Sequence, residues 1–161
     1  SLKFQPGENR LAVGYDDGMV EIWDTRNRER IWEVKAHEKE VTGIRFNGQK
    51  PQMATAGRDG TLRLWGTGDQ AELPVSFSDN GGPVIAIEFS SDGNLIISGT
   101  GSKADNLKAR PAETDLLAAD ISPKITRNFT RSEWLAYVGN DIEYEETVSR
   151  ADYNILIKEL K

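Results

Sequence analysis

Short runs of alternating apolar and polar residues recur along the first two thirds of the chain, separated by turn-forming residues. In VTGIRF (41–46) and VIAIEF (84–89) the apolar side chains alternate in the second half, as expected of strands with one buried face. The intervening FQPGEN, DDG, RDG and SSDG stretches carry the Gly, Pro and Asp that favour tight turns. The pattern predicts an all-β fold of short antiparallel strands joined by hairpins.

This strand pattern repeats. LAVGYDDGMVEIWD (11–24) aligns with MATAGRDGTLRLWG (53–66) at a constant offset of 42 residues, and a third copy begins at VIAIEFSSDGNLIISG (84–99). RIWEVKA and ELPVSF supply a fourth strand for the first two copies. Four antiparallel strands repeated about every forty residues are typical of the blades of a β-propeller.

Residues 2–110 resemble the WD-repeat β-propeller family. The IWD that ends the first copy and the LW of the second match the family signature, and Ala36-His37 stands where the family usually has Gly-His. The resemblance implies about two and a half to three blades of an incomplete ring, at about 1–35, 36–77 and 78–111.

After Pro111 the pattern changes from strands to helices. TRSEWLAYVG (130–139) has a capping box at its start, an apolar face and a glycine at its end. ETDLLAADI (113–121) and SRADYNILIKELK (149–161) also show helical spacing. We therefore expect two parts, a partial WD-repeat propeller over 1–111 and a short helical C-terminal extension over 112–161.

The stretch 126–147 is similar to the tail that closes WD-repeat regions in large bacterial proteins, which often carry an upstream signal-transduction ATPase or caspase-like domain. Propellers close with about 4–8 blades, more than this chain supplies. The chain also opens at Ser1 inside a strand pattern. We expect either the C-terminal fragment of a longer WD-repeat protein, whose remaining blades complete the ring, or a homo-oligomer of a complete chain.

The composition of the chain argues against several classes of function. The net charge is −6 and no stripe of Lys or Arg stands out, which argues against a nucleic-acid partner. The absence of cysteine excludes disulfides and thiolate metal sites and fits a cytoplasmic protein. No apolar run approaches the ~18 residues of a membrane helix. GTGSK (99–103) lacks the phosphate-loop order and NDIEYEE (140–146) lacks the calcium-loop pattern, so neither a cofactor nor a metal is expected.

His37 is the only histidine of the chain. In the WD-repeat family a complete blade carries a hydrogen-bonded tetrad, and the resemblance assigns this structural tetrad in the second copy to His37, Thr55, Asp59 and Trp65. An imidazole has one donor and one acceptor and can bridge a carboxylate and a hydroxyl. The alternative, a catalytic His37, would need a nucleophile and an orienting acid beside it, and every candidate already has a framework role.

The other two copies depart from this pattern. The first offers a partial tetrad, Asp17 and Trp23, because Val13 replaces the hydroxyl residue. The third has no histidine and no clear turn aspartate, and Arg110 stands where the tryptophan would be. We expect the second blade alone to be complete.

In the WD-repeat family the propeller face near the tetrad commonly binds proteins and peptides. Here that possible partner-binding face would present Asp16, Glu38, Lys39, Glu40 and Arg58, although these charges are also what ordinary solvated loops carry. The sequence predicts a protein that is not an enzyme: a scaffold or sensor module that binds a protein or peptide. The alternative is the regulatory propeller of a bacterial signal-transduction ATPase or caspase-like effector protein.

Overall fold

The computed structural model describes residues 1–68, 74–78, 80–101, 107–113 and 130. The chain divides into two compact units, Ser1–Thr114 and Asp115–Lys161, and all the described strands belong to the first unit. The helices expected in the C-terminal extension lie outside the described residues.

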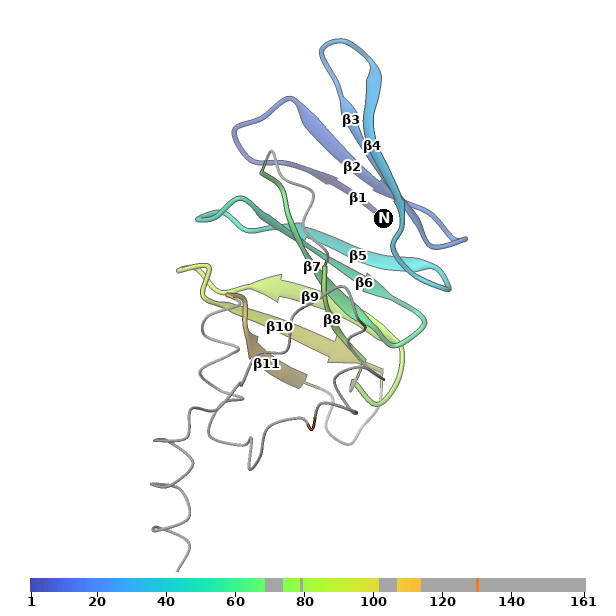
Figure 1. Ribbon diagram of the computed structural model, residues 1–161, viewed down its shortest axis with the longest axis vertical. Helices are drawn as coiled ribbons and strands as arrows, with labels where there is room; N and C mark the ends of the chain where they lie inside the picture. The colour runs from blue at the N-terminus through green and yellow to red at the C-terminus, as the bar shows by residue number, and fades with distance from the viewer. Residues whose placement is uncertain (69–73, 79, 102–106, 114–129, 131–161) are drawn as a thin grey trace, which may run out of the picture. The chain divides into compact units, whose positions relative to one another are not determined.

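The described residues of the first unit are all-β and form three antiparallel sheets that follow one another along the chain (Figure 1). Sheet 1 has the order β1-β2-β3-β4, sheet 2 the order β5-β6-β7-β8, and sheet 3 the order β9-β10-β11. The prediction of an all-β fold with about three repeated sheets is confirmed. The strands are β1 Leu2–Phe4, β2 Arg10–Gly14, β3 Met19–Asp24, β4 Glu29–Lys35, β5 Val41–Phe46, β6 Gln52–Gly57, β7 Leu62–Gly66, β8 Val75–Phe77, β9 Val84–Phe89, β10 Leu95–Thr100 and β11 Leu107–Pro111.

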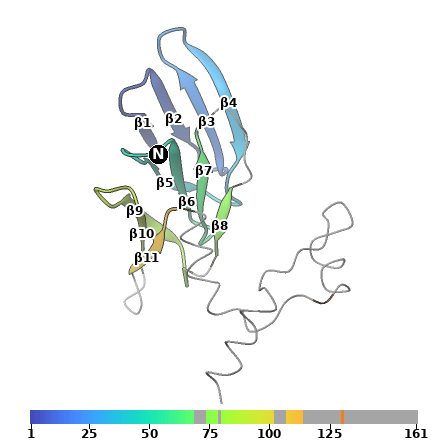
Figure 2. The ribbon, with the colours of Figure 1, turned by 60° about the vertical axis from the view of Figure 1, so that its left-hand side comes forward.

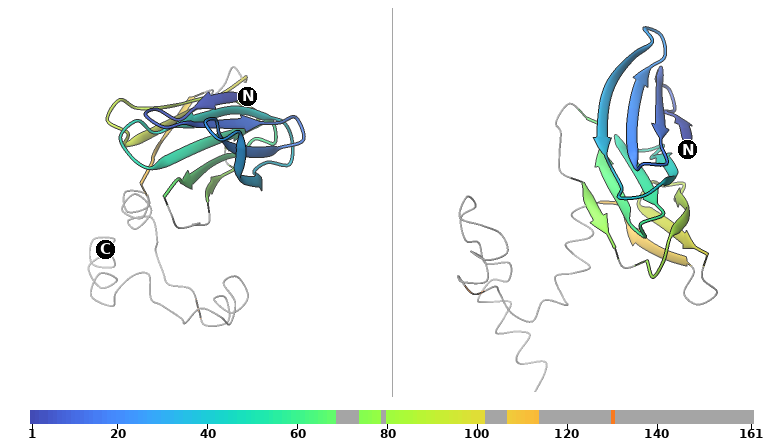
Figure 3. Two further views of the ribbon diagram at one scale, coloured as in Figure 1. Left: turned by 90° about the horizontal axis from the view of Figure 1, so that it is seen from above. Right: turned by 90° about the vertical axis from the view of Figure 1, so that its right-hand side faces the viewer.

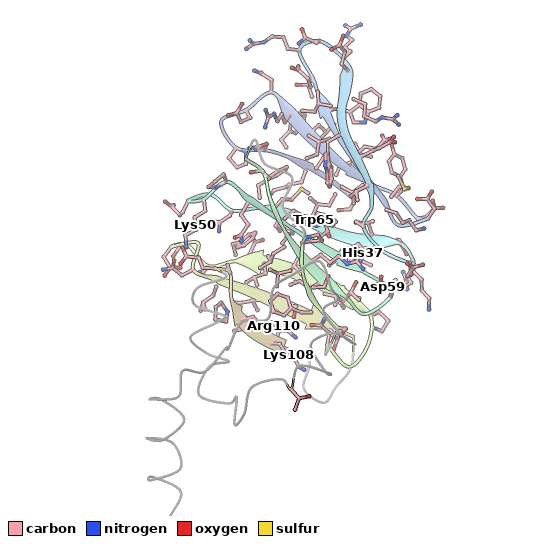
Figure 4. The ribbon with its side chains drawn as sticks, viewed as in Figure 1. His37, Lys50, Asp59, Trp65, Lys108 and Arg110 are labelled. Carbon is pink, nitrogen blue, oxygen red and sulfur yellow. The ribbon has the colours of Figure 1, made fainter. Side chains whose placement is uncertain are left out.

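The Asp-Gly turns lie where the repeat predicts them. Gly18 joins β2 to β3 with φ +90°, and Gly60 joins β6 to β7 with φ +86°. Side chains with a Cβ rarely adopt this left-handed region, so glycine is the residue that permits the tight hairpin at both places. The β2–β3 and β6–β7 hairpins and the start of β5 all lie at one end of sheets 1 and 2. His37 and Asp59 lie at this end (Figure 4).

Two hydrophobic cores hold the three sheets together, with sheet 2 between the others (Figures 2 and 3). One core joins sheets 1 and 2 and contains Ala12, Val20, Ala36, Val41, Ile44, Phe46, Met53 and Trp65. The other joins sheets 2 and 3 and contains Ala54, Ala56, Leu62, Leu64, Val84, Ile87 and Ile96. Because strand side chains alternate between the two faces, sheet 2 contributes one set of residues to each core.

Sheets 1 and 3 expose large apolar side chains in the described structure, among them Leu95 and Leu107 of sheet 3 at 41% and 70%. Phe4 of β1 is 62% exposed, whereas Phe46, at the same place in β5, is 7% exposed beneath sheet 1. Leu2 is 67% exposed and its counterpart Ile44 is fully buried. Large apolar side chains are thus exposed where the repeat elsewhere places another sheet.

Candidate functional site

His37 lies in the connection between β4 and β5 and is 1% exposed. Its backbone N–H and that of Ala36 donate to the carbonyl of Gly18 at 3.0 Å each, which ties the connection to the β2–β3 hairpin of sheet 1. This placement turns the imidazole towards sheet 2, beside Thr55 on β6 and Asp59 in the β6–β7 turn (Figure 4).

The four predicted tetrad residues form a continuous chain of hydrogen bonds. Trp65 Nε1 donates to Thr55 Oγ1 at 3.0 Å, and Thr55 Oγ1 lies 2.8 Å from His37 Nε2. On the other side of the ring, His37 Nδ1 lies 3.2 Å from Asp59 Oδ1. A fifth member, Thr61, was not anticipated from the sequence: its Oγ1 is 2.8 Å from His37 Nδ1 and donates to Asp59 Oδ1 at 2.8 Å.

The hydrogen-bond directions fix the tautomer of His37. Thr55 already accepts from the indole N–H of Trp65, so its own O–H is free to donate to His37 Nε2. The proton of the neutral ring sits on Nδ1, because this nitrogen faces the carboxylate of Asp59, which can only accept. Each polar group in the chain has a partner, which is the condition under which a buried network stabilises a fold.

The electrostatics agree with a neutral imidazole. Burial lowers the pKa of His37 below its ordinary value of 6.5, although the nearby carboxylate of Asp59 opposes the shift. Burial alone would raise the pKa of Asp59, but hydrogen bonds from the backbone N–H groups of Thr61 and Glu38 outweigh it and hold that pKa below 3.8. The contact between His37 and Asp59 is therefore a hydrogen bond to a carboxylate and not an ion pair at neutral pH.

Two glycines leave room for His37, Gly57 beside its imidazole and Gly18 beside its backbone carbonyl. A Cβ at Gly57 would lie 2.3 Å from His37 Nδ1 and 2.4 Å from Asp59 Oδ1. A Cβ at Gly18 would lie 2.0 Å from the carbonyl oxygen of His37. A larger side chain at Gly57 would displace the network, and one at Gly18 would displace the backbone of the β4–β5 connection.

The network has little capacity for catalysis. Both ring nitrogens of His37 are engaged, the hydroxyls of Thr55 and Thr61 are engaged, and the imidazole is sealed from solvent. A general base has to reach a substrate proton, and a nucleophile has to be accessible. Among the described residues no cluster of His, Asp and Glu is arranged to hold a metal ion. No helix in that part of the chain is long and apolar enough to cross a membrane.

Sheet 1 does not join Asp17 and Trp23 into a partial tetrad. Val13 stands opposite Glu21 in the β2–β3 pairing and has no hydroxyl, so the indole N–H of Trp23 donates to Glu21 Oε2 at 2.8 Å instead. Asp17 Oδ1 accepts from the backbone N–H of Met19 at 2.9 Å and closes the hairpin turn.

Glu21 is the acceptor around which the polar groups of sheet 1 gather. Tyr15 donates its hydroxyl to Oε2 at 2.7 Å, and Arg30 donates to Oε1 at 2.8 Å. The hydrogen bonds from Tyr15 and Arg30 lower the pKa of Glu21 below its ordinary value. In sheet 1 the indole N–H of Trp23 is thus satisfied by a carboxylate of the same strand.

Sheet 3 builds a network of its own from different residues. Arg110 donates to Ser98 Oγ at 2.9 Å and to Asn80 Oδ1 at 3.0 Å, and Ser98 donates to Asn80 Oδ1 at 3.0 Å. By register these three residues take the places of Trp65, Thr55 and His37. The guanidinium of Arg110 also lies 5.1 Å from the ring centre of Phe77, a cation–π contact with sheet 2. The third repeat keeps a hydroxyl at Ser98 and has Asn80 and Arg110 in place of the histidine and the tryptophan, and these three side chains are hydrogen-bonded to one another.

The predicted partner-binding face is brought together at one end of sheets 1 and 2. Arg58 Nε donates to Glu40 Oε2 at 2.7 Å, and the backbone N–H of Glu38 donates to Asp59 Oδ2 at 2.9 Å. The carbonyl of Tyr15, next to Asp16, accepts from the N–H of Val41 at 2.9 Å. The side chains of Asp16, Glu38, Lys39 and Arg58 are exposed and Glu40 is half-buried.

Comparison with known proteins places the repeat in a family. The family described as "WD domain, G-beta repeat" matches residues 1–24, 28–66 and 72–106, more than half of the chain. The chain is 42% identical over 57 residues to Periodic tryptophan protein 1 homolog of Drosophila melanogaster, a match covering 34% of this chain and 12% of that protein. It is 29% identical over 100 residues to Topless-related protein 4 of Arabidopsis thaliana, which covers 57% of this chain and 9% of that protein.

Solved structures show the same fold. A chain of the mitotic checkpoint complex superposes with a TM-score of 0.64 at 21% identity, over 71% of this chain and 36% of that chain. The computationally designed Ika8 protein superposes with a TM-score of 0.58 at 26% identity, over 69% of this chain and 32% of the designed chain. This chain therefore spans about a third of each solved chain and a smaller part of the fly and plant relatives. Because three repeats of the chain match this family and they form three consecutive sheets, the chain belongs to the WD40 repeat family, and sheets 1, 2 and 3 are blades of a WD40 β-propeller.

Proposed function

We propose that this WD40 unit is a non-catalytic binding module that holds a protein or peptide partner at the end of sheets 1 and 2 where Asp16, Glu38, Lys39, Glu40 and Arg58 lie. WD40 modules are typically protein-binding scaffolds. The observation that carries the proposal is the attachment of these exposed loops to the buried network. Binding residues are commonly found on loops that a rigid scaffold positions.

Three backbone attachments support this assignment. The carboxylate of Asp59 accepts from the N–H of Glu38, the carbonyl of Glu40 accepts from the N–H of Arg58 at 2.9 Å, and the carbonyl of Gly18 accepts from the N–H of His37. The exposed side chains therefore project from a backbone that is already ordered. Pre-ordering reduces the entropy lost when a partner binds.

The surface charge of this face suits a polar, partly basic partner segment. The ion pair of Arg58 with Glu40 is exposed and contributes little to stability, so both groups can exchange this contact for one with a partner. Asp16 and Glu38 add negative charge to a face that also carries the cation Lys39. Opposite charges on a partner would give specificity and faster association.

Affinity capture with the whole chain tests the proposal. Arg58→Glu is expected to reduce recovery of the partner strongly, because it reverses a charge within the face and repels Glu40. Arg28→Glu is the matched control, since Arg28 is an exposed arginine in the β3–β4 hairpin at the opposite end of sheet 1. Equal recovery with both variants would remove the basis for this face.

We also propose that further WD40 blades cover the outward faces of sheets 1 and 3. The contrast between Phe4 and Phe46 measures what a neighbouring blade hides: 62% exposure against 7%. This unit matches only about a third of a solved chain with the same fold, which favours a longer polypeptide that supplies the other blades. A homo-oligomer is the alternative. The intact mass of the native protein and light scattering of the 161-residue chain distinguish the two. A monodisperse monomer of 161 residues in both measurements would contradict the proposal.

The regulatory role in a bacterial signal-transduction ATPase or caspase-like effector protein stays an alternative within the same proposal. It rests on the similarity of residues 126–147, which lie almost wholly outside the described residues. An effector domain in the same native polypeptide would favour it over the plain scaffold.

A further inference from the structure

A cavity of ≈ 400 Å³ lies between sheets 1 and 2, away from the partner-binding face. It opens where β2 begins and β7 ends, at the end of the sheets opposite His37 and on the side where Lys50 lies (Figure 4). The volume falls in the range of about 300–1,000 Å³ that ligand sites in proteins occupy. Its apolar wall consists of Ile22, Ile31, Trp32, Met53 and Trp65.

Two indole rings form the rigid part of this wall. The rings of Trp32 and Trp65 meet edge to face, with centres 5.5 Å apart and planes at 78°. Trp65 is held by its hydrogen bond to Thr55, so its position is fixed by the His37 network. Aromatic rings prefer edge-to-face or offset contacts, and a third ring entering the cavity would find such partners already oriented.

A β-bulge places an exposed apolar side chain at the mouth. In the β3–β4 pairing Ile22 stands opposite Trp32 and Trp23 opposite Arg30, which leaves Ile31 as the extra residue. Bulges commonly redirect a side chain at a functional edge of a sheet. Ile31 is 47% exposed although it lines the cavity, so part of its apolar surface is available to an occupant.

Arg10 is the one charged residue among the described residues that line the cavity. Within the described part of the chain its guanidinium has no ion pair or hydrogen bond. The side-chain oxygen of Gln5, also in the wall, is buried and meets no hydrogen-bond donor among the described residues. A rotation of the Gln5 amide would present this acceptor to an occupant without breaking a hydrogen bond of that oxygen.

From this arrangement we propose that the cavity binds a short peptide segment in which an aromatic side chain is followed by an acidic residue. The aromatic ring packs against Trp32, Trp65 and Ile31. The carboxylate pairs with Arg10, whose planar fork of N–H groups matches a carboxylate in two hydrogen bonds. A backbone N–H of the segment donates to Gln5. The site is independent of the partner-binding face, which lies at the other end of the same two sheets.

The test uses the whole 161-residue chain and two acetylated dipeptide amides, phenylalanyl-aspartyl and phenylalanyl-asparaginyl. Indole N–H resonances, assigned with Trp→Phe variants, report on occupancy. The aspartyl peptide is expected to shift the signals of Trp32 and Trp65 to saturation and to leave Trp23, which does not line the cavity, unchanged. The asparaginyl peptide keeps the shape and removes the charge, so it is expected to bind about tenfold more weakly.

Variants of the protein test the contact between Arg10 and the carboxylate of the peptide. Arg10→Gln is expected to weaken the aspartyl peptide about tenfold and to remove the difference between the two peptides. Arg28→Gln, an exposed arginine outside the cavity, is expected to bind as the unmodified chain does. The proposal is overturned if the aspartyl peptide produces no saturable shift, if both peptides bind the unmodified chain equally, or if Arg28→Gln weakens binding as much as Arg10→Gln.

Discussion

Replacing Thr55 by Val removes the central hydroxyl of the His37 network and keeps the shape of the side chain closely. Thr55 is fully buried, and its oxygen accepts from Trp65 Nε1 and lies 2.8 Å from His37 Nε2. The variant leaves a buried indole N–H and a buried ring nitrogen without partners. Each unsatisfied buried polar group costs about 1–3 kcal/mol, so the two together are expected to lower the free energy of unfolding by about 2–6 kcal/mol.

Urea unfolding followed by tryptophan fluorescence measures this loss. With a slope of about 1–3 kcal/mol per molar urea, the midpoint is expected to fall by about 1 M or more. Thr67→Val is the matched control, because the Thr67 hydroxyl has no hydrogen-bond partner within the described residues, and its change is expected to stay within about 0.5 kcal/mol. A Thr55→Val midpoint equal to that of the control would refute the assignment of Thr55 as the centre of a stabilising network.

Three further predictions concern the same networks. Since the pKa of His37 in the folded chain lies below 6.5, the unfolded chain binds the proton more readily than the folded chain does. The contribution of His37 to stability is therefore complete above about pH 6.5 and decreases as the pH falls below it. His37→Gln should remove this pH dependence from urea midpoints measured across the same range. Gly57→Ala should lower the free energy of unfolding by about 2 kcal/mol, because its Cβ would displace His37 and Asp59. Gly48→Ala, whose Cβ would have nothing within 4 Å, should cost nothing measurable. Equal urea midpoints for the two alanine variants would contradict the close approach of Gly57 to His37 and Asp59. Arg110→Met should lower the melting temperature by withdrawing donors from Ser98 and Asn80 at a cost of about 1–3 kcal/mol, and calorimetry showing no change would rule out a stabilising role for the sheet 3 network.

The repeat made much of the fold predictable. The constant offset and the Asp-Gly turns are local features of the chain, and they suffice to locate the hairpins and the three sheets. The tetrad could be assigned because sheet 2 keeps the residue types of the family at His37, Thr55, Asp59 and Trp65. All four lie in one hydrogen-bonded chain.

Sheet 3 shows where matching by residue type fails. Asn80 and Arg110 differ in residue type from His37 and Trp65, and Ser98 alone keeps the hydroxyl of Thr55, so a search for the family signature leaves this blade without a complete tetrad. A register comparison could have found them, because Asn80 and His37 both stand four residues before the first residue of the innermost strand of their sheets. What the blades have in common is that each buried donor has an acceptor, and different sets of side chains can satisfy this requirement.

The Glu21 cluster of sheet 1 and the cavity at Arg10 depend on pairing between strands. Trp23 turns to Glu21 because the residue opposite Glu21 is Val13, and this follows from the β2–β3 register. The mouth of the cavity depends on the bulge at Ile31, which the alternation of apolar residues in RIWEVKA does not reveal. Contacts of this kind follow from the strand register, which the spacing of apolar residues alone does not specify.

Hydrogen–deuterium exchange of the unit with its captured partner tests the central claim most directly. The partner is expected to slow exchange in residues 15–18, 36–40 and 58–61, the segments that carry the partner-binding face, and to leave exchange in the β3–β4 hairpin at 25–28 unchanged. Protection confined to the β3–β4 hairpin, with residues 36–40 exchanging as in the free chain, would contradict a partner site on that face.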